Sequence, residues 1–474
     1  MAKQLFNSSE KSNFILNMTE EKYSELAAYG LIAACFAPSL FALIPEFAKK
    51  LSFTVVTGGI SIAGVICMVL ALISAMKKYI TKKILFPVCT FGFIVVWSVL
   101  SLINSFDVNT SLYGFPGRGE GVLAFVFYFS FFVTGASVRR SGTASKFINA
   151  VIVSGLLSSA VALVQIFTGK LSHYRFLYLD IEANAASGLA QSPIFLAMLL
   201  SVCLIAAETG FIMSQSKKRR IFCLVSICVF SFVMMFTYSL LGICGLVSAV
   251  ITGIITVIKT KAPKIRLLSA AAVAVPAAAA VLLVYAGAIG TISSYRLYDG
   301  YSLWWADSYM RLSASGDNDL ERLDLSSTKD VYLYLNDKTV NIIGKYPILG
   351  TGPDQLVFPQ LYTYGTLDEQ SNIDDIISQN RGAFDKVYNE YLYTAATRGI
   401  PSLIALLLLL ISVIVTGCKK LRKKADENDV CLMSVIVCGS LLFMIGVSNI
   451  TFSPIFWAAA GLLISRGNEY VSNS

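Results

Sequence analysis

The residues best suited to chemistry in this chain are arginines in the polar stretches between its long apolar segments. An arginine stays charged, and its planar guanidinium group can pair with two phosphate oxygens at once. Arg118 is the most suggestive, because it lies between two glycines, where a ligand can approach the backbone, and two residues before Glu120. The other arginines of this kind are Arg175, Arg296, Arg311, Arg322, Arg381 and Arg398. The alternative for each arginine is a solvated or interface-anchoring side chain, and for Glu120 it is a charge that caps a helix start.

Carboxylates are the candidates for acid–base chemistry, since the only histidine is His173. Activating an acceptor hydroxyl needs a base or a well-placed dipole. Glu390 follows Lys386 by one helical turn, so an ion pair is the alternative to a catalytic role for it. The other carboxylates of the same region are Asp354, Asp374, Asp375 and Asp385. The ten cysteines lack metal-ligand spacing, so we expect neither a metal site nor a cofactor.

The elements that must position these residues are apolar runs of about twenty residues. The sequence is 55% hydrophobic and 14% charged, whereas soluble domains are roughly 25% charged. Such runs cross a bilayer as helices, which satisfy their own backbone hydrogen bonds. We therefore predict an all-α integral membrane protein with about twelve transmembrane helices. Their expected ranges are 26–46, 52–76, 84–104, 120–138, 147–168, 192–213, 221–238, 240–258, 267–290, 401–418, 430–447 and 450–465.

The basic residues predict the orientation of these helices. Twenty lysines and arginines fall in alternate loops, beginning with the one at Lys77 and Lys78, whereas the short loops between carry five. This is the positive-inside pattern, so the net charge of +9 reflects topology and indicates no nucleic-acid partner. Residues 1–25 and 466–474 are then cytoplasmic, and a large loop, residues 291–400, faces outward between helices in 26–290 and 401–465.

The large outer loop is predicted to contain two helices. The first runs from about Thr328 to Ile343, before Gly344 and Pro347. The second runs from about Asp385 to Thr397; Asp385 can cap it, Gly399 can end it, and Pro401 suits the first turn of the next helix. One face of the second helix carries tyrosines and small residues, and packing against the bundle is the plain interpretation of that face.

Several motifs of this chain resemble those of the O-antigen ligase and polymerase superfamily. The most specific is Pro347-Ile-Leu-Gly-Thr-Gly-Pro-Asp354, followed about thirty residues later by Asp385-Lys-Val-Tyr-Asn-Glu-Tyr-Leu392. Residues 117–121, 186–197 and 237–242 are similar to three further family segments, in the same order. The resemblance implies a twelve-helix bundle with an outer helical subdomain. It also implies an inverting, metal-independent glycosyltransferase that moves a glycan from undecaprenyl pyrophosphate to an acceptor outside the cytoplasmic membrane.

The chain departs from the family pattern at three positions. The family's catalytic histidine falls on Tyr388, and tyrosine is a poor base at neutral pH. The arginine of a family turn falls on Leu240, and another falls on or near Tyr332, where Arg322 could substitute. Through the resemblance and the chemistry above, we assign Tyr388, Asn389 and Glu390 as catalytic candidates. Arg118, Arg175 and Arg322 are the candidates for binding the donor pyrophosphate, and Glu120, Asp354, Asp385 and Arg398 for support.

The sequence therefore predicts a multi-pass protein of a bacterial cytoplasmic membrane that ligates or polymerises an envelope glycan. Its expected partners are an undecaprenyl-pyrophosphate-linked glycan, membrane lipid, and an acceptor that is a glycan, a lipid or a protein. The first alternative is a catalytically degenerate relative that binds lipid-linked glycan or scaffolds a polysaccharide export complex. The second is an exporter or flippase, which would be expected to place charged groups inside the bundle, whereas Glu208 lies near a span end.

Overall fold

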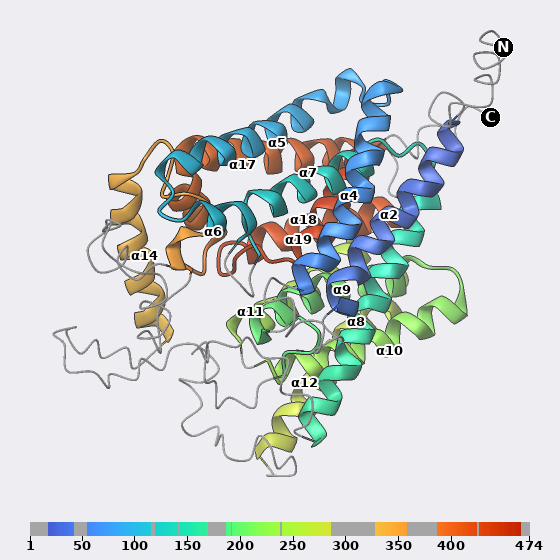
Figure 1. The fold of residues 1–474 in the computed structure, drawn as a ribbon. Coiled ribbons are helices and arrows are strands. Elements are labelled where there is room, and N and C mark those ends of the chain that lie inside the picture. Colours follow the sequence, from blue (N-terminus) through green and yellow to red (C-terminus); the bar gives the residue numbers. More distant parts are fainter. Residues whose placement is uncertain are drawn as a thin grey trace, which may run out of the picture.

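The computed structural model describes residues 18–41, 55–114, 119–140, 142–168, 186–190, 192–237, 239–285, 328–357, 386–423 and 426–465. Within these ranges all regular structure is helical, as predicted (Figure 1). The helices are α2 (Glu20–Phe41), α4 (Val55–Met76), α5 (Lys82–Leu100), α6 (Val108–Tyr113), α7 (Val122–Ala136), α8 (Gly142–Thr168), α9 (Pro193–Met213), α10 (Lys217–Met235), α11 (Leu240–Thr260), α12 (Leu268–Tyr285), α14 (Thr328–Lys345), α17 (Glu390–Lys423), α18 (Glu427–Leu442) and α19 (Ser453–Ile464). Short 3-10 turns lie at Ser101–Asn104, Lys264–Leu267 and Gln355–Val357.

Seven helical stretches of the described chain are long and apolar enough to cross a membrane. They are Gly58–Met76, Lys82–Asn104, Gly142–Thr168, Pro193–Met213, Leu240–Thr260, Lys264–Leu283 and Glu390–Lys423. Each of the twelve predicted spans overlaps a helix, but α7 and α19 are apolar helices of fewer than 18 residues. The multi-pass architecture is thus present, while the count of twelve crossings stays a prediction.

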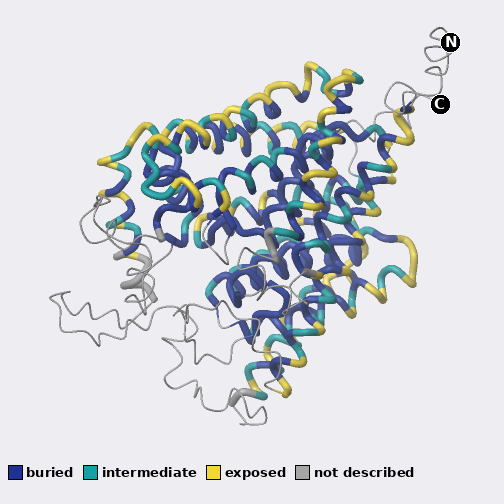
Figure 2. Tube along the Cα trace, viewed as in Figure 1, coloured by how far each residue is buried: buried dark blue, intermediate teal, exposed yellow. Residues whose placement is uncertain are grey.

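Helix α9 forms the centre of the bundle, with α8, α10, α11 and α18 packed around it. All of its residues except the last are buried, as its uniformly dark trace in Figure 2 shows. The outer helices instead expose rows of large apolar side chains, which is the arrangement expected for contact with lipid. These rows include Ile62, Val65, Val69 and Leu72 on α4 and Ile251, Ile254, Ile255 and Ile258 on α11.

The two helices predicted in the large outer loop are only partly as expected. The first is α14, which packs against α17 as the ribbon shows at one end of the bundle (Figure 1). The second begins at Glu390 and continues through a break into the next apolar helix as α17. Gly399 is non-helical there, with φ 78° and ψ 167°, so the predicted end at Gly399 and restart near Pro401 are confirmed.

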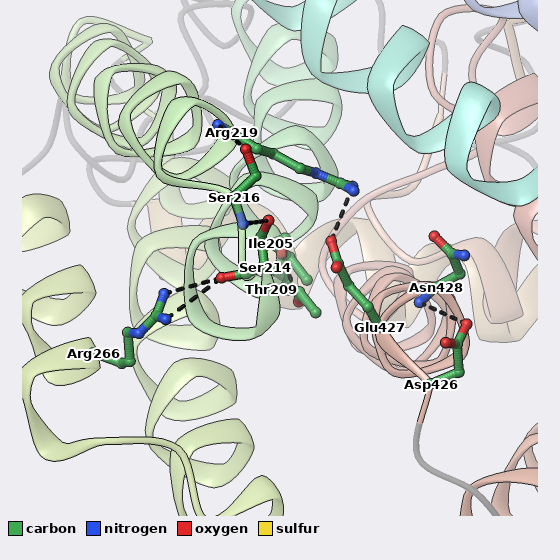
Figure 3. Close-up of polar contacts among 9 residues, drawn as sticks. All are labelled: Ile205, Thr209, Ser214, Ser216, Arg219, Arg266, Asp426, Glu427 and Asn428. Carbon is green, nitrogen blue, oxygen red and sulfur yellow. Dashed lines mark hydrogen bonds and ion pairs between the residues drawn. The ribbon is translucent and has the colours of Figure 1, made fainter.

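Several basic residues of the predicted inner loops have structural partners (Figure 3). Arg219 pairs with Glu427 at 3.0 Å and so joins α10 to α18. Arg266 donates to the carbonyl oxygens of Phe211 at 2.6 Å and Ser214 at 3.4 Å, which lie at the carboxyl end of α9. A cation suits that end of a helix dipole, so Arg266 ties the connection between α11 and α12 to the carboxyl end of α9.

Glu208 is more deeply enclosed than its place in the sequence suggested. It is 1% exposed, and a Cβ atom on Gly253 of α11 would collide with its carboxyl oxygen Oε1. Glu208 can be buried here because residue 253 is glycine and leaves room for the carboxyl group.

Candidate functional site

The segment that follows α14, residues 346–357, is a tight turn that requires its glycines. Gly350, Gly352 and Asp354 all have positive φ, at 69°, 98° and 60°. Thr351 donates its backbone N–H to the carbonyl of Ala396 at 2.9 Å, and Gly352 donates to that of Thr397 at 3.0 Å. A Cβ atom at Gly350 would collide with the backbone of Thr397. The Gly-Thr-Gly-Pro-Asp motif is thus a scaffold that lies directly on α17.

Gln355 fastens the same segment to the α5–α6 connection, a role that the sequence did not suggest. Its Oε1 accepts from the backbone N–H groups of Phe106 and Asp107, each at 3.1 Å. Its Nε2 donates to the Asp107 carbonyl at 3.0 Å and to Ser111 Oγ at 2.9 Å. The fully buried amide therefore uses both of its ends as a cross-link.

Asp354, a predicted supporting residue, is fully buried and faces α17. Its Oδ1 accepts a hydrogen bond from Tyr393 Oη at 2.8 Å. This hydrogen bond links the turn to α17, and the role of Asp354 in the site stays a prediction.

The start of α17 brings the three predicted catalytic residues together. Asn389 is half-buried, and its Oδ1 accepts from the backbone N–H groups of Tyr391 at 3.0 Å and Leu392 at 3.1 Å. It is therefore the residue that caps the helix, and the expected helix start at Asp385 is wrong. Tyr388, at the family's histidine position, is 3% exposed.

A buried cation lies beside Tyr388. Lys386 is 5% exposed, and its ammonium lies 5.4 Å from the ring centre of Tyr388 and 5.7 Å from that of Phe195 in α9. Lysine is rarely buried to this degree unless its charge is paired. The sequence presented Lys386 only as an ion-pair partner for Glu390; the structure adds it as a neighbour of the candidate site.

Glu120 and Glu390 are buried and joined through one serine. Ser448 donates its backbone N–H to Glu390 Oε2 at 2.7 Å and its hydroxyl to Glu120 Oε2 at 2.8 Å. Tyr128 donates to Glu120 Oε1 at 2.5 Å, and Thr394 donates to Glu390 Oε1 at 3.0 Å. The N-cap of α7 is Gly121, without a side-chain cap, so helix capping does not account for Glu120.

Arg398 lies beside these acids and is fully buried. Its guanidinium carbon is 3.7 Å from the ring centre of Phe125, and Nη2 donates to the Glu120 carbonyl oxygen at 3.3 Å. Its charge also interacts with those of Glu390, Glu120 and Asp354. Arg398 is therefore a buried cation that interacts electrostatically with three carboxylates, and its supporting role in the site stays a prediction.

The other two motif-like segments lie against each other. Ala186 donates its backbone N–H to the Phe236 carbonyl at 2.8 Å, next to the turn that contains Leu240. Gln165 Oε1 holds the same stretch by accepting from Ser187 at 3.0 Å and Gly188 at 2.9 Å. Leu240 is the first residue of α11, so an apolar side chain stands where the family pattern has an arginine.

A small cavity borders the acid network. Its volume is about 10 Å³, and Glu390, Thr394 and Ser448 provide its polar wall. The rest of its wall is apolar: Phe91, Ile94, Phe125, Leu406, Phe443 and Trp457. This is about the space of a single water molecule, so no sugar enters here.

Four predicted site residues lie outside the described residues: Arg118, Arg175, Arg322 and Asp385. Their assignment stays a prediction. The described part of the site therefore consists of the turn at 346–357, the start of α17, and the acid network that leads to Glu120.

Comparison with known proteins agrees with these motifs. Residues 222–407 match the family model described as O-antigen ligase. This match supports membership of the O-antigen ligase superfamily. The match covers α10 to the first part of α17, including the glycine turn and Tyr388. No curated protein matches the chain. The family suggests glycosyltransferase-like activity on lipid-linked glycans by a multi-pass bacterial membrane protein.

Proposed function

We propose that this O-antigen ligase superfamily member transfers or polymerises a glycan from an undecaprenyl-pyrophosphate donor at the outer face of the bacterial cytoplasmic membrane. The observation that carries the proposal is the meeting of distant motif segments at the start of α17. The glycine turn binds α17 through Ala396 and Thr397, and Glu120 reaches Glu390 through Ser448. The ring centre of Phe195, from the 186–197 segment, lies 5.7 Å from the ammonium of Lys386, which lies 5.4 Å from the ring centre of Tyr388.

In this proposal the oxygen of the acceptor hydroxyl bonds to the anomeric carbon of the donor sugar, the bond from that carbon to the lipid diphosphate breaks, and the hydroxyl proton passes to the departing diphosphate or to solvent. Positive charge near the departing diphosphate stabilises the charge that develops there. We assign this task to Arg118, Arg175 and Arg322, and we add Lys386, whose ammonium lies 5.4 Å from the ring centre of Tyr388. The reaction as proposed uses no metal ion.

The acceptor side of the reaction is assigned to Tyr388, Asn389 and Glu390. Glu390 accepts from Ser448 and Thr394, which supports a fixed carboxylate near the acceptor more than a mobile base. The side-chain oxygen of Asn389, Oδ1, caps α17. A part of Asn389 in catalysis would therefore come through its side-chain NH₂ group. Tyr388 would orient the acceptor by hydrogen bonding, because a phenol is a weak base at neutral pH.

Reconstitution with a lipid-linked donor tests the proposal. Purified protein in nanodiscs would receive an undecaprenyl-pyrophosphate-linked glycan and candidate acceptors, and transfer would be followed by the release of lipid pyrophosphate. We expect turnover by the wild type and losses of at least about a hundredfold in Arg118→Ala and Glu390→Gln, in line with the loss of one transition-state donor. Arg422→Ala, an exposed arginine in the last turn of α17, is the matched control. Full transfer by both site variants would reject the assignment.

A second candidate function is favoured by Tyr388 and Leu240, which replace two residues of the family pattern. In this alternative the protein binds lipid-linked glycan, or scaffolds a polysaccharide export complex, without turnover. The same nanodiscs distinguish the two, because the alternative predicts saturable donor binding with no release of lipid pyrophosphate from any acceptor mixture.

A further inference from the structure

The connection between α18 and α19, residues 443–452, lies outside all the family-like motifs, yet it holds the start of α17 in place. The backbone N–H of Glu390 donates to the carbonyls of Phe443 at 2.8 Å and Gly446 at 2.9 Å. Tyr391 Oη donates to the Ser440 carbonyl at 2.7 Å, at the end of α18. The first turn of α17 therefore depends on this connection for its position.

Ser448 is the one residue of this connection that binds both site acids. Its backbone N–H is committed to Glu390 and its hydroxyl to Glu120, and all three residues are at most 3% exposed. Ser453 Oγ lies 2.7 Å from Ser448 Oγ and extends the network. Each carboxylate oxygen of the two acids thus has a hydrogen bond from a neutral donor, which fixes both side chains in single orientations.

The two interactions of Ser448 differ in what a mutation would remove. Its N–H belongs to the backbone and survives any side-chain change, so Glu390 keeps that bond in Ser448→Ala. Its hydroxyl donates to the Glu120 carboxylate, and this hydrogen bond connects the start of α17 to the segment that precedes α7. Arg398 contacts the same segment through the Glu120 carbonyl, which leaves the carboxylate to be oriented by Tyr128 and Ser448.

We propose that Ser448 is a positioning residue for the glycan transfer proposed above: its hydroxyl couples the Glu120 segment to Glu390 and sets the orientation of the Tyr388–Asn389 turn toward the reacting groups. This inference rests on the proposed function. Ser448 lies outside the matched residues 222–407 and acts through Glu120 and Glu390. Its loss should therefore lower the rate of the chemical step more than the affinity for the donor.

The test is steady-state transfer in nanodiscs by wild type, Ser448→Ala and Ser448→Thr. Removing the hydroxyl should lower kcat by about 10- to 100-fold, as a misplaced supporting group does, while KM for the donor changes less than threefold. Threonine keeps a hydroxyl and should recover most of kcat. Ser412→Ala, further along α17, removes a hydroxyl that donates to the Leu409 carbonyl, and it should transfer like wild type.

A double-mutant cycle with Glu120→Gln provides an independent measure, whatever threonine does. If Ser448 acts through Glu120, the kcat of the double variant should be no lower than that of the less active single variant. Wild-type kcat in Ser448→Ala, or losses that multiply in the double variant, would overturn the inference while leaving the proposed function intact. A loss of folded protein in Ser448→Ala, seen as aggregation on size exclusion, would also overturn it, in favour of a purely structural role. Absence of transfer by the wild type would reject the proposed function itself, and this inference with it.

Discussion

Replacing Arg398 by methionine should lower the stability of the bundle, because this fully buried guanidinium interacts electrostatically with three acids. Its charge interacts with those of Glu390, Glu120 and Asp354, and the side chain is fully buried. Removing one partner from a buried charge cluster costs roughly 3–5 kcal/mol, since the remaining charges lose their compensation. The ring of Phe125 at 3.7 Å adds a desolvated cation–π contact, worth about 2 kcal/mol.

These contributions overlap, so we expect Arg398→Met to lower the free energy of unfolding by roughly 3–5 kcal/mol in total. Arg398→Lys keeps the charge but loses the planar guanidinium that stacks and donates several hydrogen bonds. Its free energy of unfolding should lie between those of Arg398→Met and the wild type. Combining Arg398→Met with Glu120→Gln should recover part of the loss, because one of the uncompensated charges is then absent.

Unfolding in mixed micelles, followed by tryptophan fluorescence as the denaturing detergent increases, measures these differences. Trp457 is buried against Phe91 and reports on the bundle near the site. Arg422→Met is the control, and its exposed position should keep the change within about 0.5 kcal/mol. A loss below about 1 kcal/mol in Arg398→Met, or no recovery on adding Glu120→Gln, would refute the reasoning that this cation balances the buried acids.

Three further predictions concern the elements that frame the site. Gln355→Leu leaves the buried N–H groups of Phe106 and Asp107 without their acceptor, so the same detergent titration should show a loss of about 2–3 kcal/mol; an unchanged midpoint would contradict the cross-link. Gly399→Ala combines a positive φ with a collision against the Ile348 carbonyl, so folded protein on fluorescence size exclusion should fall severalfold, whereas Gly142→Ala has open space and should accumulate normally. Lys386→Gln should weaken binding of lipid-linked donor by about tenfold, the effect of one lost charge-assisted contact. Lys345→Gln, which changes an exposed lysine at the end of α14, should bind the donor as wild type does. Equal affinities of Lys386→Gln and wild type would show that Lys386 is not part of the donor site.

The helices could be predicted from the sequence because each carries its own signal. Apolar runs of membrane length predict most of the spans, and the end of α14 is predicted by Gly344 and Pro347. The break in α17 was also readable, since Gly399 precedes Pro401. The start of α17 was placed too early, because Asp385 and Asn389 are both good caps and only the hydrogen bonds to Tyr391 and Leu392 decide between them.

The acid network could not be predicted, because its bonds join residues that are remote in the chain. Ser448 is 328 residues from Glu120, and Gln355 is 248 residues from Asp107. Serine and glutamine in such places carry no local pattern, whereas the glycines of the turn carry one. The motif resemblance identified Glu120 and Glu390 separately, but it contained no information that one serine joins them.

The buried charges bear on whether the chain is an enzyme or only a binder of glycan. Replacing a buried charge cluster by apolar residues of similar volume is often neutral or stabilising. A scaffold that only bound glycan would therefore gain nothing in stability from Glu120, Glu390 and Arg398 in its interior. In this chain the cluster is satisfied by Tyr128, Ser448 and Thr394 and lies next to the cap of α17. Fixed charges of this kind are useful where charge develops during a reaction. Such an acid network would be more useful to the transfer reaction proposed above than to binding alone, even though Tyr388 stands where the family pattern has histidine.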